Sequence, residues 1–210
     1  MYKDTEDSTK ETADNVLGNR ESRLDLVVLK YMVQRLRMTL HTLEQPTSVS
    51  LPLFYSLKER HGRTHRIAIC EPRELLEQSS LNFVGFISGK RKSVDQRVID
   101  EFMRVDKAML NQIVHIPGLL SYSSLELRTD SWYNLVLLRD AEVKTSFETI
   151  ATHRYAAYEL APSYYTWIRL HYGILSSGLA SQEMRLLKTK YYAFSAMQPE
   201  TIMRERSYEA

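Results

Sequence analysis

Several features that commonly assign a chain to a specialised class are scarce or missing in this sequence. Among its 210 residues there is one cysteine, Cys70, so no internal disulfide can form and a reducing, cytoplasmic location is expected. No apolar run approaches the roughly 20 residues that span a membrane, and the polar first residues do not resemble a secretory signal. The sequence therefore predicts a cytoplasmic protein without a transmembrane segment.

Charge and motif content exclude further classes. The 28 basic and 26 acidic side chains nearly balance, which removes the bulk electrostatic reason to expect nucleic acid as a partner. A glycine-rich phosphate loop, a dinucleotide fingerprint and a nucleophile elbow are all absent. The histidines and the cysteine do not fall at the spacing of metal ligands, so no metal site is predicted.

The chain is long enough to bury a substantial core, and its first part divides into two segments. Residues 1–21 are polar and charged and are expected to be a disordered tail. From Ser22, a suitable helix N-cap, apolar residues recur at helical spacing until Pro46 ends the helix. A strand through residues 26–29 remains an alternative, because Leu-Val-Val-Leu has high strand propensity. Residues 22–80 are predicted to form an N-terminal helical extension that packs on the main domain.

The main domain is predicted at residues 81–196, where strand and helix patterns alternate. The predicted elements are a strand at 83–87, a helix at 93–113, strands at 119–127 and 132–138, a helix at 141–158, and strands at 164–172 and 184–194. The first six have the order of an α+β, ferredoxin-like fold, in which two helices cover one face of an antiparallel sheet. Residues 197–210 are predicted to be a polar tail.

The uncovered sheet face predicts an association. Residues two apart on a strand share a face, so Trp167, Arg169 and His171 point to one side together, with Tyr165 expected beside them. The residues on the other face of this strand suit packing against helices. Trp167, Arg169 and His171 are therefore expected to face the uncovered side of the sheet. Such a surface is too apolar to leave in water, and a two-fold axis that pairs two sheets would bury it. The sequence thus predicts a homodimer that closes into an α/β barrel.

Four features carry a resemblance to a known family: the Pro117-Gly118 turn, Tyr122, the strand at 132–138 and the helical His153. They resemble the antibiotic-biosynthesis-monooxygenase-like members of the dimeric α/β-barrel superfamily, over about residues 81–175. The resemblance implies a ferredoxin-like fold, a dimer and activities that include cofactor-independent oxygenation, haem degradation and isomerisation. It also implies that His153 borders a cavity between helix and sheet, that Tyr122 contacts a ligand, and that haem is one cofactor to consider.

The candidate site residues have specific chemical roles. Arg169 is suited to fix a carboxylate, Trp167 to stack on a ring and His171 to move a proton near neutral pH. The alternative is that these three residues belong to a subunit interface, where tryptophan and arginine are enriched. His153 is either a base on an acidic phenol, an axial ligand to haem iron, or a surface residue that compensates the helix dipole.

Two functions follow from these observations. The first is a binding protein for a small hydrophobic or aromatic ligand, without established catalysis. The second is a cofactor-independent or haem-dependent monooxygenase, or an isomerase, that uses a histidine as base.

Overall fold

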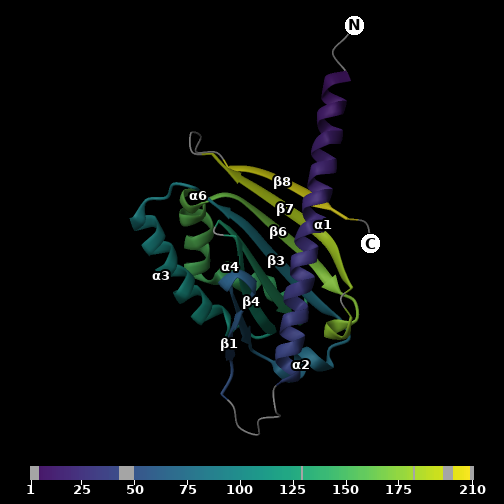
Figure 1. Cartoon of the computed structure of the whole chain (residues 1–210), viewed down its shortest axis with the longest axis vertical. Helices are drawn as coiled ribbons and strands as arrows, with labels where there is room; N and C mark the ends of the chain where they lie inside the picture. Colours follow the sequence, from purple (N-terminus) through teal and green to yellow (C-terminus); the bar gives the residue numbers. More distant parts are fainter. Residues whose placement is uncertain (1–4, 43–49, 129, 182, 196–200, 209–210) are drawn as a thin grey trace.

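The protein forms one eight-stranded antiparallel sheet with helices on both faces. The computed structural model describes residues 5–42, 50–128, 130–181, 183–195 and 201–208. The strands are β1 (Leu53–Lys58), β2 (Thr64–Ile69), β3 (Leu81–Lys90), β4 (Leu119–Arg128), β5 (Ser131–Leu138), β6 (Tyr165–Leu175), β7 (Met184–Phe194) and β8 (Thr201–Ser207). Their order across the sheet is β1-β2-β4-β5-β3-β6-β7-β8 (Figure 1). The predicted α+β class is confirmed.

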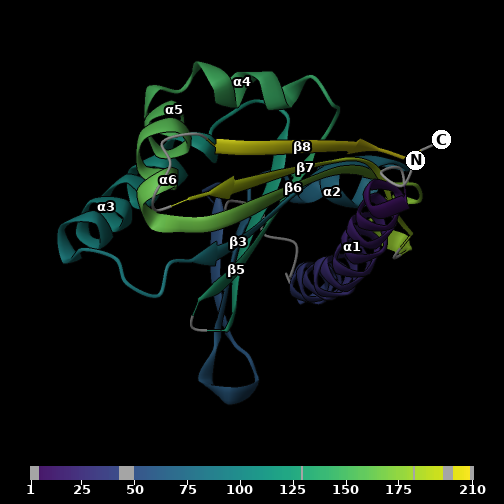
Figure 2. The ribbon, with the colours of Figure 1, turned by 90° about the horizontal axis from the view of Figure 1, so that it is seen from above.

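The helices divide between the two faces of the sheet. They are α1 (Thr5–His41), α2 (Pro72–Glu77), α3 (Gln96–Ile113), α4 (Val143–Thr149), α5 (Ala151–Tyr155) and α6 (Ala161–Tyr164), with a π-helical turn at Ala156–Leu160. Figure 2 shows α3 to α6 on one side of the strongly twisted sheet and α1 on the other. The face that the sequence left bare is therefore covered by the chain's own first helix. The reason given for a barrel dimer, an uncovered apolar face, does not hold.

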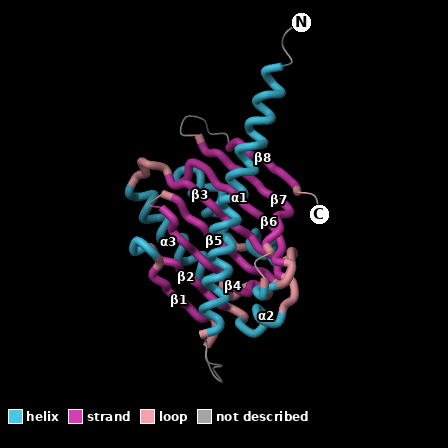
Figure 3. Tube along the Cα trace, turned by 45° about the vertical axis from the view of Figure 1, so that its right-hand side comes forward, coloured by secondary structure: helices cyan, strands magenta, loops and turns pink. Residues whose placement is uncertain are grey.

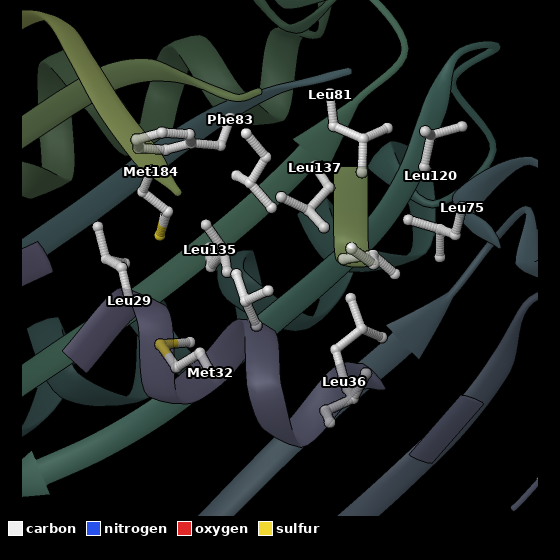
Figure 4. Packing of buried hydrophobic residues seen from close by; sticks show 14 of the residues in the cluster. Leu29, Met32, Leu36, Leu75, Leu81, Phe83, Leu120, Leu135, Leu137 and Met184 are labelled. Atoms are coloured by element: carbon white, nitrogen blue, oxygen red, sulfur yellow. The ribbon is translucent and has the colours of Figure 1, made fainter. Parts of the chain in front are cut away.

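Helix α1 packs on the sheet through one apolar side. Leu29, Met32, Val33, Leu36 and Leu40 recur every three or four residues and are buried. Figures 3 and 4 show the helix lying across the strands, with Leu135 and Leu137 of β5 and Met184 of β7 among the opposing side chains. Each fully buried leucine or methionine contributes about 1.5–3 kcal/mol relative to exposure, so this seam is a large share of the stability.

The start of α1 differs from the prediction. Helix α1 begins at Thr5, whereas the sequence predicted the start of the first helix at Ser22. Once the packed half has formed, each further residue adds a hydrogen bond without the cost of nucleation, which composition alone does not show.

Residues 53–69 form two strands within the segment that was predicted as an N-terminal helical extension. Strand β1 is an edge strand that follows Pro52, as a proline-interrupted run allows, and it pairs with β2. Strand β2 also pairs with β4, so the segment predicted as an extension is part of the sheet. At the other edge, β8 lies within the predicted polar tail. Its residues are almost all exposed, and its charged side chains bridge to β7, as Glu205 does to Lys188 at 2.7 Å.

The predicted central elements lie close to their expected ranges, with one exception. The helix predicted at 141–158 is broken at Ile150, whose backbone is extended (φ −79°, ψ 115°), and it continues as α5 after this break. Strands β4, β5, β3 and β6 lie side by side in that order and are antiparallel throughout.

Candidate functional site

The structure separates the predicted site residues onto opposite faces of the sheet. Trp167, Arg169 and His171 project from β6 toward α1, as the strand periodicity predicts. Tyr165 projects the other way and packs with Phe102 of α3, because the β3–β6 pairing shifts register between Gly89 and Lys90. Tyr122 and His153 lie on the side of α3 to α6.

Arg169 is held by acidic residues of α1. Its Nε donates to Asp25 Oδ2 at 2.7 Å and its Nη2 to Asp25 Oδ1 at 3.2 Å, a fork-like geometry. Its Nη1 donates to Glu21 at 2.8 Å, and its guanidinium carbon lies 4.3 Å from the centre of the Trp167 ring. The side chain expected to bind an anionic ligand thus binds two carboxylates of its own chain.

His171 completes the same cluster. Its Nε2 lies 2.9 Å from Asp25 Oδ2, and its Nδ1 lies 2.8 Å from Thr189 Oγ1. Tyr133 donates a further hydrogen bond to Asp25 Oδ1 at 2.9 Å. The chain of contacts ends at the Tyr208 hydroxyl, 3.2 Å from Thr189 Oγ1 and 3.3 Å from Ser22 Oγ.

Asp25 is the centre of this cluster, and sequence reasoning missed it. It is 1% exposed and His171 is fully buried. Burial raises the pKa of Asp25, but its hydrogen bonds with His171 and Arg169 and their charges outweigh that effect, so the pKa lies below its usual value. A carboxylate four residues before Leu29, on the apolar side of a helix, is the signal that could have revealed it, because a buried charge requires partners. The cluster fixes α1 on the sheet.

A cavity of about 240 Å³ lies on the opposite face, between α3 and the β1–β2–β4 part of the sheet. It forms where β1 and β2 extend the sheet past α3. Its lining residues are Phe54, Tyr55, Ser56, Arg66, Ile67, Ala68, Asp106, Leu110, Tyr122 and Ser124. The lining is mainly apolar and aromatic with a few polar groups, as in most small-molecule sites.

Two ionisable groups in this cavity have shifted pKa values. Burial raises the pKa of Asp106, and the positive charge of Arg66 offsets that shift only in part. Burial also raises the pKa of Tyr122, with the charge of Asp106 acting in the same direction. The Tyr122 hydroxyl donates to Asn134 Oδ1 at 3.1 Å, which fixes its orientation. A carboxyl with a raised pKa in a cleft is a candidate for proton transfer.

Comparison with known proteins gives little further information. No protein-family model matches the chain, and no curated protein matches it. Among solved structures, the chain is similar to SnoaB, a cofactor-independent oxygenase from Streptomyces nogalater. The identity is 14% and the TM-score 0.33, over 47% of this chain and 92% of that one. That is a weak fold link, so function has to be argued from the cavity.

His153 lies on α5, away from the cavity lining. It is half-buried, its ring centre lies 6.1 Å from that of Phe147, and burial lowers its pKa despite the opposing charge of Glu148. His153 does not line the described cavity, and none of the residues that do line it is a histidine or a cysteine, so these residues do not fit haem. Within the described ranges, no three His, Cys, Asp or Glu side chains group as metal ligands, and no helix is long and apolar enough to cross a membrane.

Proposed function

We propose that this protein binds a small aromatic compound in the cavity between α3 and the β1–β2–β4 part of the sheet. The observation that supports this most directly is the convergence of Arg66, Asp106 and Tyr122 on a mainly apolar, partly aromatic hollow. The volume of about 240 Å³ exceeds the roughly 150 Å³ of a cavity that holds benzene, which suits a ligand of one or two rings.

The polar groups define the chemical class of ligand. The ring of Phe54 and the side chain of Leu110 offer apolar contact to a planar ring. Arg66 is exposed and offers donors to a carboxylate or phenolate. Asp106 can accept a hydrogen bond from a hydroxyl of the ligand. A hydroxylated aromatic carboxylate satisfies all three requirements, whereas a plain aromatic carboxylate or a phenolate satisfies the first two.

A second candidate function is proton-transfer catalysis in the same cavity. It is supported by the raised pKa of Asp106, which makes this carboxylate a stronger base than an ordinary aspartate. Asp106 then acts as the base, a role for which a histidine was predicted, and the reaction is an isomerisation or a cofactor-independent oxygenation of an acidic phenol.

A proposed fold relationship is compatible with both functions. We propose that β3, α3, β4, β5, the α4–α6 segment and β6 form a ferredoxin-like unit distantly related to the antibiotic-biosynthesis-monooxygenase-like family. The antiparallel strand order β4-β5-β3-β6 favours this proposal.

Binding can be tested with 1-naphthoate, 2-naphthol and naphthalene as probes. We expect 1-naphthoate to raise the melting temperature of the protein, because a ligand that binds the native state stabilises it. Arg66→Ala should weaken 1-naphthoate binding about tenfold or more, as expected for losing a charge-assisted hydrogen bond of about 1.5–3 kcal/mol, and should affect 2-naphthol less. Isothermal titration gives the dissociation constants.

Arg63→Ala is the matched control, since this neighbouring arginine does not line the cavity. Equal losses in the two arginine variants would count against Arg66 as the anion contact. If none of the three probes changes the melting temperature, the cavity is not a site for small aromatic compounds.

A further inference from the structure

The outer side of α1 carries an apolar stripe that the sheet does not cover. The exposed fractions are 58% for Leu24, 66% for Val27, 39% for Tyr31 and 49% for Met38. These positions follow one another at three, four and seven residues, so they lie on one side of the helix, opposite the seam that packs on the sheet. Figures 1 and 2 show α1 on the outside of the molecule. Large apolar side chains in such a row are typical of an interaction surface.

A row of basic residues borders this stripe along one edge. Arg23, Lys30 and Arg37 repeat every seven residues, and Arg20 continues the stripe toward the N-terminus. The three arginines are exposed and Lys30 is half-buried. Among the described residues, no carboxylate forms an ion pair with any of these four side chains. Their positive charge is therefore not compensated within the described parts of the chain.

Two carboxylates that border the outer side of α1 are already bound within the chain. Glu21 accepts a hydrogen bond from Arg169 Nη1 at 2.8 Å. Glu59 forms an ion pair with Arg35 at 2.9 Å and accepts a hydrogen bond from the Tyr31 hydroxyl. Neither carboxylate is left to neutralise the basic row.

The turn between β1 and β2 adds a further cation beside the stripe. Burial and the hydrogen bond to Glu59 raise the pKa of Tyr31, whereas the positive charges of Arg35 and Arg60 oppose this shift. Arg60 is therefore close enough to act on a member of the stripe, and it is exposed. The outer side of residues 20–38, together with Arg60, is named the outer face.

We propose that the outer face lies on the surface of an anionic phospholipid bilayer. The apolar stripe enters the boundary between headgroups and acyl chains, and the basic residues bind the negatively charged headgroups. The stripe runs about 21 Å from Leu24 to Met38 along the convex side of a helix, which suits a planar partner. The contact lies on the opposite side of the sheet from the cavity and does not depend on the proposed ligand.

The composition of the outer face favours a bilayer over a second copy of the chain and over nucleic acid. Two outer faces brought together would oppose their own uncompensated cations. The phosphates of nucleic acid would attract the cations but would leave Leu24 and Val27 in water. An anionic bilayer supplies negative charge and an apolar layer at the same surface.

The N-terminal half of α1 is compatible with this contact. By helical periodicity the positions of Asp7, Glu11 and Asp14 fall on the side that continues the sheet-packing seam, away from the bilayer. The position of Glu6 falls on the outer side, but it lies about 21 Å along the helix before Arg20. The acidic positions therefore do not interrupt the basic row.

The test is co-sedimentation of the full chain with phosphatidylcholine vesicles that contain about one third phosphatidylserine, compared with vesicles of phosphatidylcholine alone. The wild-type protein is expected to bind the anionic vesicles at least tenfold more tightly, and this binding should weaken as sodium chloride is raised. Equal binding to the two kinds of vesicle, or no binding to either, overturns the proposal.

Two variants separate the two parts of the outer face. R23E/K30E reverses the charge of the basic row and should weaken binding to the anionic vesicles at least tenfold. L24S/V27S removes two exposed apolar side chains and should weaken the same binding at least fivefold, because less apolar surface leaves water. Wild-type affinity in either variant contradicts the proposed contact.

Matched controls make the same chemical changes at exposed positions away from α1. K92E/R97E reverses two charges and M103S/Y158S removes two exposed apolar side chains, and both should bind like the wild type. Circular dichroism and the melting temperature establish that all variants fold. Equal losses in the controls would show that the contact does not use α1. Binding to duplex DNA without binding to vesicles would assign the basic row to nucleic acid, and dimer mass in sedimentation velocity without vesicle binding would assign the stripe to a second copy.

Discussion

Asp25 shows how one residue can decide where a helix packs. Its carboxylate is almost removed from water, which costs several kcal/mol unless the charge is matched. Arg169, His171 and Tyr133 supply that match from two strands, so α1 has one satisfactory position on the sheet. A shift of α1 by a single turn would leave the carboxylate and the arginine buried without each other.

Asp25→Asn is expected to lower the free energy of unfolding at pH 7 by about 3–5 kcal/mol, because it leaves Arg169 and His171 without their acceptor. The folded-state pKa of Asp25 lies below its ordinary value of 3.8, so its contribution is complete above that value and is lost as the pH falls through the lower pKa. Urea denaturation from pH 7 to pH 2.5 should show a steeper acid loss in the wild type than in the variant.

Asp130→Asn is the control, since Asp130 is exposed. An Asp25→Asn protein within about 1 kcal/mol of wild type at pH 7 would contradict the assigned role of the cluster.

At the residue scale, the sequence predicted to which side of a strand a side chain points better than it predicted which residues that side chain contacts. Strand alternation correctly turned Trp167, Arg169 and His171 to one side of β6. It did not indicate what they meet, because the partner carboxylate lies 146 residues from His171 in the chain and no local pattern links the two. The cavity residue Arg66 was not among the predicted site residues, since its neighbours in the cavity come from α3 and β4, which lie far from it in the chain.

Among the elements, the contact between α1 and β3 depends on a small residue. At Gly85 a Cβ atom would lie 2.7 Å from Leu29 Cδ1 and 3.5 Å from His171 Cβ. The helix can therefore approach the strand this closely only because Gly85 has no side chain.

Gly85→Ala is expected to destabilise the protein by about 1–3 kcal/mol through overpacking. Leu29→Ala alone should cost about 2–5 kcal/mol. The double variant should lose less than the sum of the two, because truncating Leu29 makes room for the added methyl group. Urea denaturation of the four proteins measures this coupling, and strictly additive losses would show that Leu29 and residue 85 do not compete for space.

Whether an element could be predicted depended on how apolar it is. Helix α3 and strands β4 to β6 have strong periodicity and were located from the sequence. Strand β8 was missed because an edge strand in water needs no apolar side, and its residues Ile202 to Arg206 read as part of a polar tail. The break at Ile150 was missed because no proline or glycine marks it.

For the whole molecule, the two halves of α1 have different tasks. The described core contacts of α1 begin at Ser22, so a protein lacking residues 1–19 should keep its fold, with a melting temperature within about 4 °C of the full chain. Differential scanning calorimetry checks this outcome, and a drop of more than about 10 °C would show that residues 1–19 support the core.

The fold class and most central elements were predictable because they depend on local periodicity, whereas the arrangement of the two sheet faces was not. The apolar residues on one face of a sheet can be buried equally well by a helix of the same chain or by a second subunit, so the sequence does not distinguish the two. The deciding contact, between Asp25 and β6, is visible only in three dimensions.

The hydrogen bonds from Tyr208 to Ser22 and Thr189 have a consequence for biosynthesis. Helix α1 is translated early, yet the groups that hold it are supplied by β6, β7 and Tyr208, which leave the ribosome much later. Until then its row of leucines and methionines lacks the part of its packing surface that β6 and β7 supply, and Asp25 lacks Arg169 and His171. A nascent chain stalled before β6 should therefore recruit holdase chaperones, and release should follow only once Tyr208 has been added.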